Sequence, residues 1–196
     1  AEGDSIRNYK MSKQADVLML FYLLSAEELG ELLRGLGYPM PRETIPANID
    51  YYLQRTSHGS TLSSVVHSWV LARAHRDRAV EFFDESLASD INDTQGGTTA
   101  EGIHLAAMVG GIDLLQRCFA GLTMRQGVLW LNPHWPSELG ELTLSIRFRG
   151  QPIGIRVSGR SVSVSTEARW GFPSVTCACR DRTVRLGPGE TAHFPA

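Results

Sequence analysis

One nine-residue stretch, residues 96–104, combines residue types that suit the binding of an anion; it reads Gly-Gly-Thr-Thr-Ala-Glu-Gly-Ile-His. Thr98 and Glu101 have the spacing of a capping box, in which each side chain binds the other residue's backbone amide at a helix start. The remaining amide groups of the first turn and the positive end of the helix dipole favour a phosphate. His104 follows Glu101 at helical spacing and lies on the same face. The stretch predicts a phosphate site; the plainer interpretation is a capped helix that happens to contain a histidine.

Two earlier polar motifs also precede apolar segments. Lys13-Gln14 leads into residues 15–24, which are apolar almost all round and predict a buried helix. Ser60 and Thr61 precede apolar residues at helical spacing, and Ser60, Thr61 or Ser63 can cap the helix. The three motifs recur at intervals of about 45 residues, a period that is typical of stacked helix pairs.

The segments between the motifs predict outer helices that return the chain. Ser25 and Glu28 form a second capping box, and a short helix is expected over residues 46–53, which begin with a proline. The pair Gly110-Gly111 predicts the end of the helix that follows His104, with a further outer helix over residues 112–119. If the inner helices run parallel, all three polar motifs lie at one end of the array, as in an α/α toroid.

The pattern changes after residue 122. Apolar and polar residues alternate in residues 142–148, 153–157 and 162–164, and Gly150 and Gly159 lie at the turns between them. Roughly six to eight short strands with such turns favour an antiparallel β-sandwich. We therefore expect an α+β chain of two domains, with helical residues 1–122 and a β-sandwich over residues 123–196. Nothing in the β-domain is typical of a catalytic site.

The composition is that of a globular protein. The chain has 196 residues and a formal net charge of -2, which gives no electrostatic reason to expect nucleic acid or an anionic membrane as a partner. It contains no apolar run of membrane-spanning length and no secretory signal pattern, so a cytoplasmic protein is expected. Cys118, Cys177 and Cys179 lack the usual zinc spacing, and we interpret them as reduced, packed thiols without a metal.

The order and spacing of the motifs resemble glycoside hydrolase family 65, the inverting disaccharide phosphorylases that include trehalose, maltose and kojibiose phosphorylases. Nearly the whole chain shares this resemblance, which is carried by residues 13–17, 55–63, 97–104 and 119–122. The family fold is an α/α toroid of six helix pairs followed by a C-terminal β-sandwich. The resemblance therefore implies that residues 1–122 form about half of such a toroid.

The resemblance implies two sets of site residues: Lys13 and Gln14, which bind the glucosyl unit, and Ser60, Thr61, Gly102 and His104, which surround the phosphate. Inorganic phosphate is then a co-substrate, and no other cofactor is implied. Because phosphate is already anionic, such a site needs hydrogen-bond donors rather than a second carboxylate to activate water. Where the family commonly has an acidic residue and a second serine, this chain has Gly59 and Thr61. The resemblance therefore does not determine which acceptor sugar is bound.

The general acid of the family is a glutamate well upstream of the Lys-Gln motif, whereas this chain begins 12 residues before Lys13. The resemblance thus implies the C-terminal part of a longer enzyme, with no catalytic residue of its own and no activity alone. Its expected partners are the disaccharide, phosphate, the N-terminal part of the catalytic domain and a second copy of the protein. A half toroid should also leave apolar sides of residues 17–24 and of the helix after His104 exposed.

Other interpretations remain open. A hydrolase with the same fold, similar to a trehalase, would use a carboxylate base in place of bound phosphate, and a truncated chain could bind sugar without catalysis. The donors of Ser60, Thr61 and His104 favour an anion over both. Glu101 is best interpreted as a capping partner rather than a catalytic residue, and His67 and His75 as packing or surface residues away from the motifs.

Overall fold

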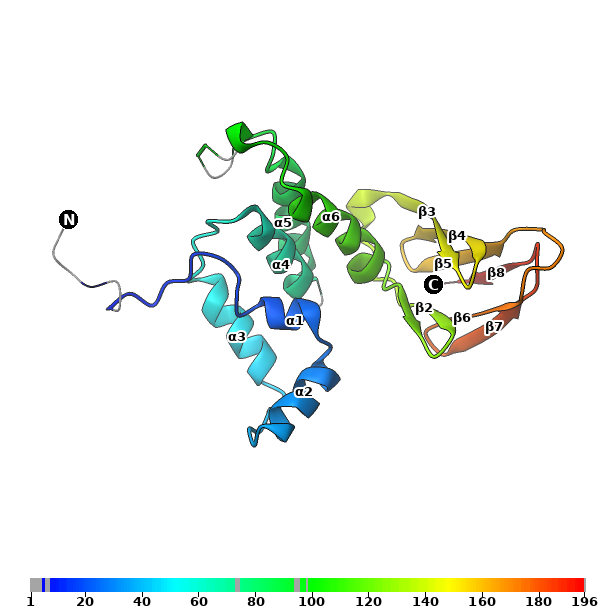
Figure 1. Ribbon diagram of the computed structural model, residues 1–196, viewed down its shortest axis with the longest axis horizontal. Helices are drawn as coiled ribbons and strands as arrows, with labels where there is room; N and C mark the ends of the chain where they lie inside the picture. Colours follow the sequence, from blue (N-terminus) through cyan, green and yellow to red (C-terminus); the bar gives the residue numbers. More distant parts are fainter. Residues whose placement is uncertain (1–4, 6–7, 73–74, 94–95, 98, 196) are drawn as a thin grey trace. The chain divides into compact units, whose positions relative to one another are not determined.

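The computed structural model describes residues 5, 8–72, 75–93, 96–97 and 99–195 (Figure 1). The chain divides into two compact units, Ala1–Ile112 and Asp113–Ala196. Helices fill the first unit and strands dominate the second, so the mixed helix-and-sheet class expected from the sequence is confirmed.

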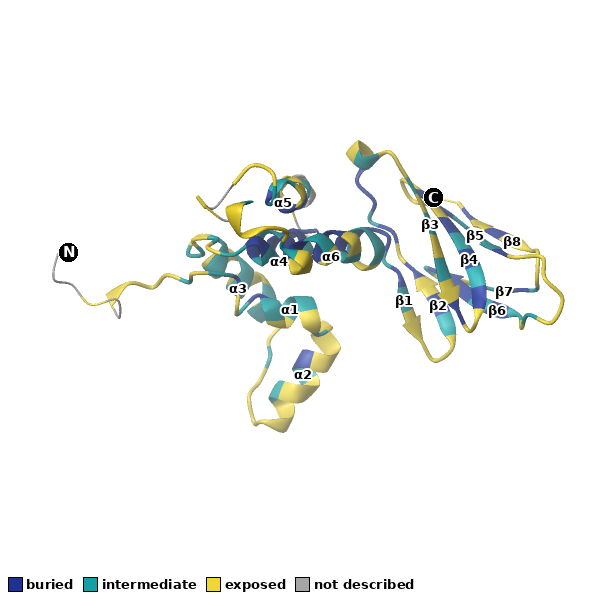
Figure 2. Ribbon diagram, turned by 45° about the horizontal axis from the view of Figure 1, so that its top comes forward, coloured by how far each residue is buried: buried dark blue, intermediate teal, exposed yellow. Residues whose placement is uncertain are grey.

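The helices are, in order, α1 (Met19–Leu23), α2 (Ala26–Gly35), α3 (Thr44–Leu53), α4 (Thr61–Leu71), α5 (Arg76–Ala88) and α6 (Leu105–Asp113). The central element is α4, because α1, α3 and α5 all contact it. Figure 2 shows α4 largely in the colour of buried residues, whereas α2 is mostly exposed. The residues that precede α4 are therefore held by the best-packed helix of this unit.

Two of the predicted helix starts are confirmed in detail. The Ser25 hydroxyl accepts from the amide of Glu28 at 3.2 Å, and the Glu28 carboxylate accepts from the amide of Ser25 at 2.8 Å, which completes the capping box of α2. The Ser60 hydroxyl accepts from the amide of Leu62 at 3.3 Å and caps α4. The short helix expected from residue 46 is also present and begins two residues earlier, at Thr44.

The prediction of a buried helix over residues 15–24 is wrong. Only the five residues of α1 are helical and none of them is buried, although Ala15 and Leu18 just before it are. The amide of Ala15 donates to the hydroxyl of Ser63 at 3.3 Å. This bond ties the start of the segment to α4.

The helix predicted to start at Thr98 begins later. Thr98 itself lies outside the described residues, but Thr99–Glu101 (η2) form only one turn of 3-10 helix and α6 starts at Leu105. Between them Gly102 has a φ of 98°, in the left-handed region, and this ends the first turn. The predicted continuous helix from the capping box into residues 105–108 is therefore wrong.

The predicted helix end at Gly110-Gly111 is also wrong, since both glycines lie inside α6. A Cβ atom on Gly110 would lie 2.7 Å from Cγ1 of Val65 on α4. The missing side chain thus allows α6 to pack closely against α4. The π-helical segment Leu114–Phe119 (η3) follows α6 directly.

The second unit contains two four-stranded sheets. One has the order β1-β2-β6-β7 and the other β3-β4-β5-β8. The strands are β1 (Thr123–Arg125), β2 (Val128–Leu131), β3 (Glu141–Phe148), β4 (Gln151–Ser158), β5 (Ser161–Thr166), β6 (Val175–Cys179), β7 (Arg182–Leu186) and β8 (Thr191–Phe194), with a single 3-10 turn, η4 (Ser137–Leu139), before β3.

The strand register confirms the predicted alternation. Ile153, Ile155 and Val157 of β4 are buried on one face, where Ile155 pairs with Val164 of β5. The pairing is antiparallel except between β2 and β6, which run parallel. This departure from the antiparallel prediction arises because the chain forms β3, β4 and β5 in the other sheet before it returns to β2.

The cysteines of β6 belong to the core of the second unit. Cys177 and Cys179 are buried thiols, and burial raises the pKa of Cys177 to about 11. A thiol with such a pKa is a poor nucleophile at neutral pH. In the first unit, none of the helices within the described ranges is long and apolar enough to cross a bilayer.

Candidate functional site

The Lys13-Gln14 segment lies alongside the turn that leads into α4. The amide of Ser12 donates to the carbonyl of Arg55 at 2.8 Å, and the amide of Ser57 donates to the carbonyl of Ser12 at 2.9 Å. The amide of Gly59 donates to the carbonyl of Lys13 at 2.7 Å. These bonds form a short parallel bridge between segments far apart in the sequence, so the first two polar motifs meet.

Gly59 allows Lys13 to lie against this turn. A Cβ atom at position 59 would lie 2.9 Å from Cγ of Lys13 and 3.2 Å from its carbonyl oxygen. The family commonly has an acidic residue at position 59, and its larger side chain would therefore displace Lys13. In the described part of the chain, the Lys13 ammonium forms no ion pair with a carboxylate.

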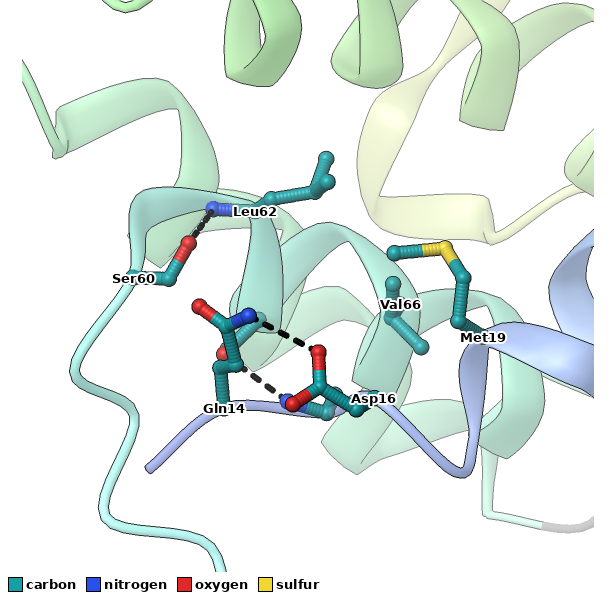
Figure 3. A pocket seen from close by; sticks show the side chains of 8 residues that line it. Gln14, Asp16, Met19, Ser60, Leu62 and Val66 are labelled. Carbon is teal, nitrogen blue, oxygen red and sulfur yellow. Dashed lines mark hydrogen bonds between the residues drawn. The ribbon is translucent and has the colours of Figure 1, made fainter. Parts of the chain in front are cut away.

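A small hollow, open to solvent, lies between the Lys13-Gln14 segment and the start of α4 (Figure 3). Its walls are formed by Gln14, Ala15, Asp16, Met19, Ser60, Leu62, Ser63 and Val66. The Gln14 side-chain amide donates to the Asp16 carboxylate at 2.8 Å. Figure 3 shows this pair on one side of the hollow and Ser60 on the other. Amide, carboxylate and hydroxyl groups can each hydrogen-bond a sugar hydroxyl.

Asp16 is a polar residue of this hollow that the sequence did not single out. It belongs to the motif that contains Lys13 and Gln14. Its carboxylate reaches the hollow because the chain turns after Gln14 and places Asp16 beside the Gln14 side chain. The signal in the sequence was its position two residues after Gln14 within an otherwise apolar segment.

The hydroxyls of Ser60 and Thr61 differ in availability. Ser60 uses an oxygen lone pair to cap α4, so its hydroxyl hydrogen stays available to donate to a ligand. Thr61 is the first residue of α4 and is only 7% exposed. A ligand at this helix start would thus meet Ser60 before Thr61.

His104 is held by an aspartate that the sequence did not identify. One Asp90 oxygen lies 2.6 Å from Nδ1 of His104, and the other accepts from the His104 amide at 3.0 Å. On the far side of the ring, Nε2 lies 3.8 Å from the Glu101 carboxylate. The hydrogen bond from His104 lowers the pKa of Asp90, so this carboxylate is ionised at neutral pH. No local spacing links two residues that are 14 positions apart.

The amides near the glycine pair are already occupied. The Asp93 carboxylate accepts from the amide of Gly97 at 2.7 Å and from that of Thr99 at 3.1 Å. We expected the amides of this stretch to bind phosphate, but the Asp93 carboxylate already accepts hydrogen bonds from two of them. At the actual start of α6, the amides of Leu105 and Ala106 donate to no group within the described ranges.

Within the first unit, the structure gathers only part of the predicted site. Lys13, Gln14 and Ser60 meet at the start of α4, where Thr61 follows. Gly102 and His104 lie on the loop before α6, and no hydrogen bond among the described residues joins His104 to Ser60 or Thr61. Because Gly110 contacts Val65, α6 and α4 are neighbours.

A pair of imidazoles, His58 and His67, lies next to the start of α4. The rings of His58 and His67 are 4.6 Å apart, and both contact Phe82. His67 is fully buried, Nδ1 lies 2.8 Å from the Ser63 carbonyl, and burial lowers the pKa of His67 to about 4. His67 is thus a packing residue as predicted, but it contacts the motif instead of lying away from it. His75 is exposed.

No group of three or more histidine, cysteine, aspartate or glutamate side chains in the described part of the chain is arranged to hold a metal ion. The polar groups of the site are amides, hydroxyls, carboxylates and one imidazole. These groups suit the hydroxyls of a sugar and the oxygens of an anion.

Known proteins are similar to this chain in sequence and fold. An uncharacterised glycosyl hydrolase of Mycobacterium tuberculosis is 54% identical over 97% of this chain and 14% of its own length. The trehalose 6-phosphate phosphorylase of Lactococcus lactis is 37% identical over 86% of this chain and 22% of its own length. A solved structure described as a kojibiose phosphorylase from the human microbiome has a TM-score of 0.69 and 22% identity, over 94% of this chain and 22% of that chain.

The chain therefore spans about a fifth or less of the length of these proteins. Residues 1–113 match the glycosyl hydrolase family 65 central catalytic domain, and residues 122–186 match the family 65 C-terminal domain. These two matches account for most of the sequence, and the chain belongs to glycosyl hydrolase family 65.

Proposed function

We propose that this chain is the C-terminal part of an inverting disaccharide phosphorylase that cleaves an α-glucosidic disaccharide with phosphate to give glucose 1-phosphate. In this proposal residues 1–122 form half of an α/α toroid, residues 123–196 form a β-sandwich, and the enzyme is a cytoplasmic homo-oligomer. The disaccharide phosphorylases among its relatives support the reaction class.

The observation that carries the proposal is the bridge between the Lys13-Gln14 segment and the turn before α4. It lays Gln14 and Ser60 along one hollow. A glucosyl unit bound by Lys13 and Gln14 would then lie beside hydroxyl donors at a helix start, where an anion is stabilised. Phosphate held close to the anomeric carbon gains the advantage of a positioned reactant.

The residues have separate roles in the proposed reaction. Lys13 and Gln14 hold the hydroxyls of the glucosyl unit, and Ser60, Thr61, Gly102 and His104 hold phosphate. A phosphate oxygen forms a bond to the anomeric carbon while the glycosidic C–O bond breaks. The departing oxygen takes its proton from a general acid outside this chain. Because phosphate attacks the face opposite the departing oxygen, the configuration at the anomeric carbon inverts. Phosphate is the co-substrate, and the reaction uses no further cofactor.

The names of the relatives suggest which disaccharides to test as substrates. Trehalose 6-phosphate phosphorylase is 37% identical to this chain, an α,α-trehalose phosphorylase 30% and a kojibiose phosphorylase 35% over shorter segments. We therefore include trehalose, trehalose 6-phosphate and kojibiose as candidate substrates, and we add maltose because the family resemblance implied it.

The test uses the full-length polypeptide that contains this chain. Each disaccharide is incubated with and without inorganic phosphate, and glucose 1-phosphate and free glucose are measured. We expect glucose 1-phosphate from at least one disaccharide, only when phosphate is present. Phosphate-independent release of glucose would instead identify a hydrolase, and sugar binding without turnover would identify a non-catalytic module.

A further inference from the structure

Asp90 contacts His104 through two different groups. One oxygen binds the backbone amide and the other binds ring nitrogen Nδ1, with a shorter separation of 2.6 Å at the ring. The side chain of Asp90 is 12% exposed and that of His104 is 25% exposed. The contact is thus shielded on the aspartate side, while part of the imidazole stays open to a ligand.

This geometry determines which ring nitrogen of His104 carries the hydrogen in the neutral form. An ionised carboxylate can only accept, so the Nδ1 atom of His104 must carry the hydrogen of this bond. The other nitrogen, Nε2, is then an acceptor in the neutral ring and a donor in the protonated ring. In both states Nε2 is the atom that can bind phosphate, as acceptor from its P–O–H group or as donor to its anionic oxygen.

We propose that Asp90 is a positioning residue, which holds His104 in the Nδ1–H tautomer and directs Nε2 to the phosphate. This inference rests on the proposed function, because it assumes that the ligand of His104 is phosphate. The same arrangement, a carboxylate behind a histidine whose other nitrogen binds the ligand, orients histidines in metal sites. The lowered pKa of Asp90 agrees with an ionised carboxylate in this role.

A neighbouring aspartate, Asp93, also hydrogen-bonds the backbone of this loop but does not bind the His104 ring. Asp93 lies on the same loop, and its carboxylate accepts from the backbone amides of Gly97 and Thr99. The polar partners of the His104 ring within the described ranges are Asp90 and Glu101. Asp93 therefore provides a matched control for the loss of an aspartate that orders the loop.

The experiment is nitrogen-15 NMR of the histidine side chains in the 196-residue chain, which reports the tautomer of His104 directly. Wild type is compared with Asp90→Asn, Asp90→Glu and the control Asp93→Asn. Inorganic phosphate is then titrated into each protein, and the Nε2 shift of His104 gives its affinity. Amide dispersion in the same spectra verifies that each variant is folded.

We expect an Nδ1–H tautomer in wild type and in Asp93→Asn. Asp90→Asn should show a mixed or Nε2–H tautomer. It should bind phosphate about tenfold more weakly, the lower end of the loss that follows removal of a carboxylate behind a metal-binding histidine. Asp90→Glu, which keeps a carboxylate acceptor, should restore the Nδ1–H form at least in part. Purely structural roles for Asp90 would not change the tautomer in a folded protein.

An Nε2–H tautomer in folded wild type would overturn the proposal without any variant. An unchanged tautomer and phosphate affinity in Asp90→Asn would also overturn it, as would an equal effect of Asp93→Asn. If phosphate leaves the wild-type His104 signals unchanged, the proposed phosphate site fails. The tautomer comparison would still decide whether Asp90 orients the ring.

Discussion

At the scale of single residues, the proposed function assigns His104 to phosphate and Lys13 to the glucosyl unit. His104 is held by Asp90 with Nε2 on the other side of the ring, whereas Lys13 lies against Gly59 next to the hollow. This separation predicts that substitutions at the two positions affect different substrates.

In the full-length enzyme, we expect His104→Ala to raise the KM for phosphate and to lower turnover, with little change in the KM for the disaccharide. Loss of a hydrogen bond to a charged group costs about 1.5–3 kcal/mol. Lys13→Ala should mainly raise the KM for the disaccharide. Initial rates with each substrate varied in turn measure both effects. Unchanged phosphate dependence in His104→Ala, together with its loss in Lys13→Ala, would reverse the two assignments.

The buried His67 predicts a dependence of stability on pH. Its pKa is about 4 in the folded chain and near 6.5 ordinarily, because burial opposes the charged ring. Between these values the unfolded chain binds the proton and the folded chain does not, so stability is complete above pH 6.5 and falls as the pH approaches 4. The loss reaches about 3 kcal/mol.

Urea unfolding at several pH values between these limits measures the effect. His67→Gln should remove most of the pH dependence, whereas His193→Gln, at an exposed position on β8, should keep it. A smaller dependence should remain, because burial also lowers the pKa of His58, with Glu85 opposing the shift. Arg78 and His58 both disfavour a charge on His67. Equal slopes in wild type and His67→Gln would contradict this account.

At the scale of elements, the contact between α4 and α6 depends on one missing side chain. Gly110→Ala would place its Cβ 2.7 Å from Cγ1 and 3.0 Å from Cγ2 of Val65. We expect a loss of about 1–3 kcal/mol in the free energy of unfolding, the usual range for overpacking. Alanine in place of glycine normally stabilises a helix by up to about 1 kcal/mol, so the direction of the change is diagnostic.

The matched control is Gly35→Ala at the end of α2, where a Cβ would meet no atom within 4 Å. That variant should be neutral or more stable in urea unfolding. Val65→Ala combined with Gly110→Ala should be less destabilised than the sum of the single changes, because the larger side chain is removed. Stabilisation by Gly110→Ala alone would show that the two helices do not pack this closely.

At the scale of the whole molecule, the exposed side of α6 predicts association. Leu105, Val109 and Ile112 recur at helical spacing and are 72%, 62% and 56% exposed. The predicted exposure of this helix is thus confirmed, and Leu20 and Leu23 of α1 are exposed as well. Apolar patches of this kind are usually covered by a partner.

We expect the 196-residue chain to form oligomers or larger assemblies at high concentration in light scattering. Leu105→Gln combined with Val109→Gln should reduce the measured mass. Met124→Gln, at an exposed position on β1, should leave it unchanged. A monomer of wild type at high concentration would contradict the prediction.

The proposed function also predicts that this chain alone has no phosphorolytic activity, because the general acid and part of the sugar pocket would come from elsewhere in the enzyme. The purified chain is assayed with phosphate and with trehalose, trehalose 6-phosphate, maltose and kojibiose. Release of glucose 1-phosphate by the chain would show that it contains a proton donor of its own. Addition of a separately expressed upstream segment is expected to restore turnover.

The sequence by itself determined the features that depend on local chemistry. The capping box of Ser25, a hydroxyl cap for α4 and the alternating strands were predicted, because each depends on a few neighbouring residues. Which of Ser60, Thr61 and Ser63 supplies that cap was left open. The motif order also indicated the family, which the matches over both parts of the chain confirm.

Only the tertiary structure decided which groups occupy the polar ends of the helices. The amides near Thr98 offered an anion site in the sequence, but Asp93 folds back onto two of them and Asp90 onto His104. Gly110 indicated a helix end, but its role is to admit Val65 from another helix. A sequence pattern indicates which local interactions, such as a cap or a turn, a residue can form. Its partner is decided by the folding of the loop, as for Asp93, or by packing between different helices, as for Gly110.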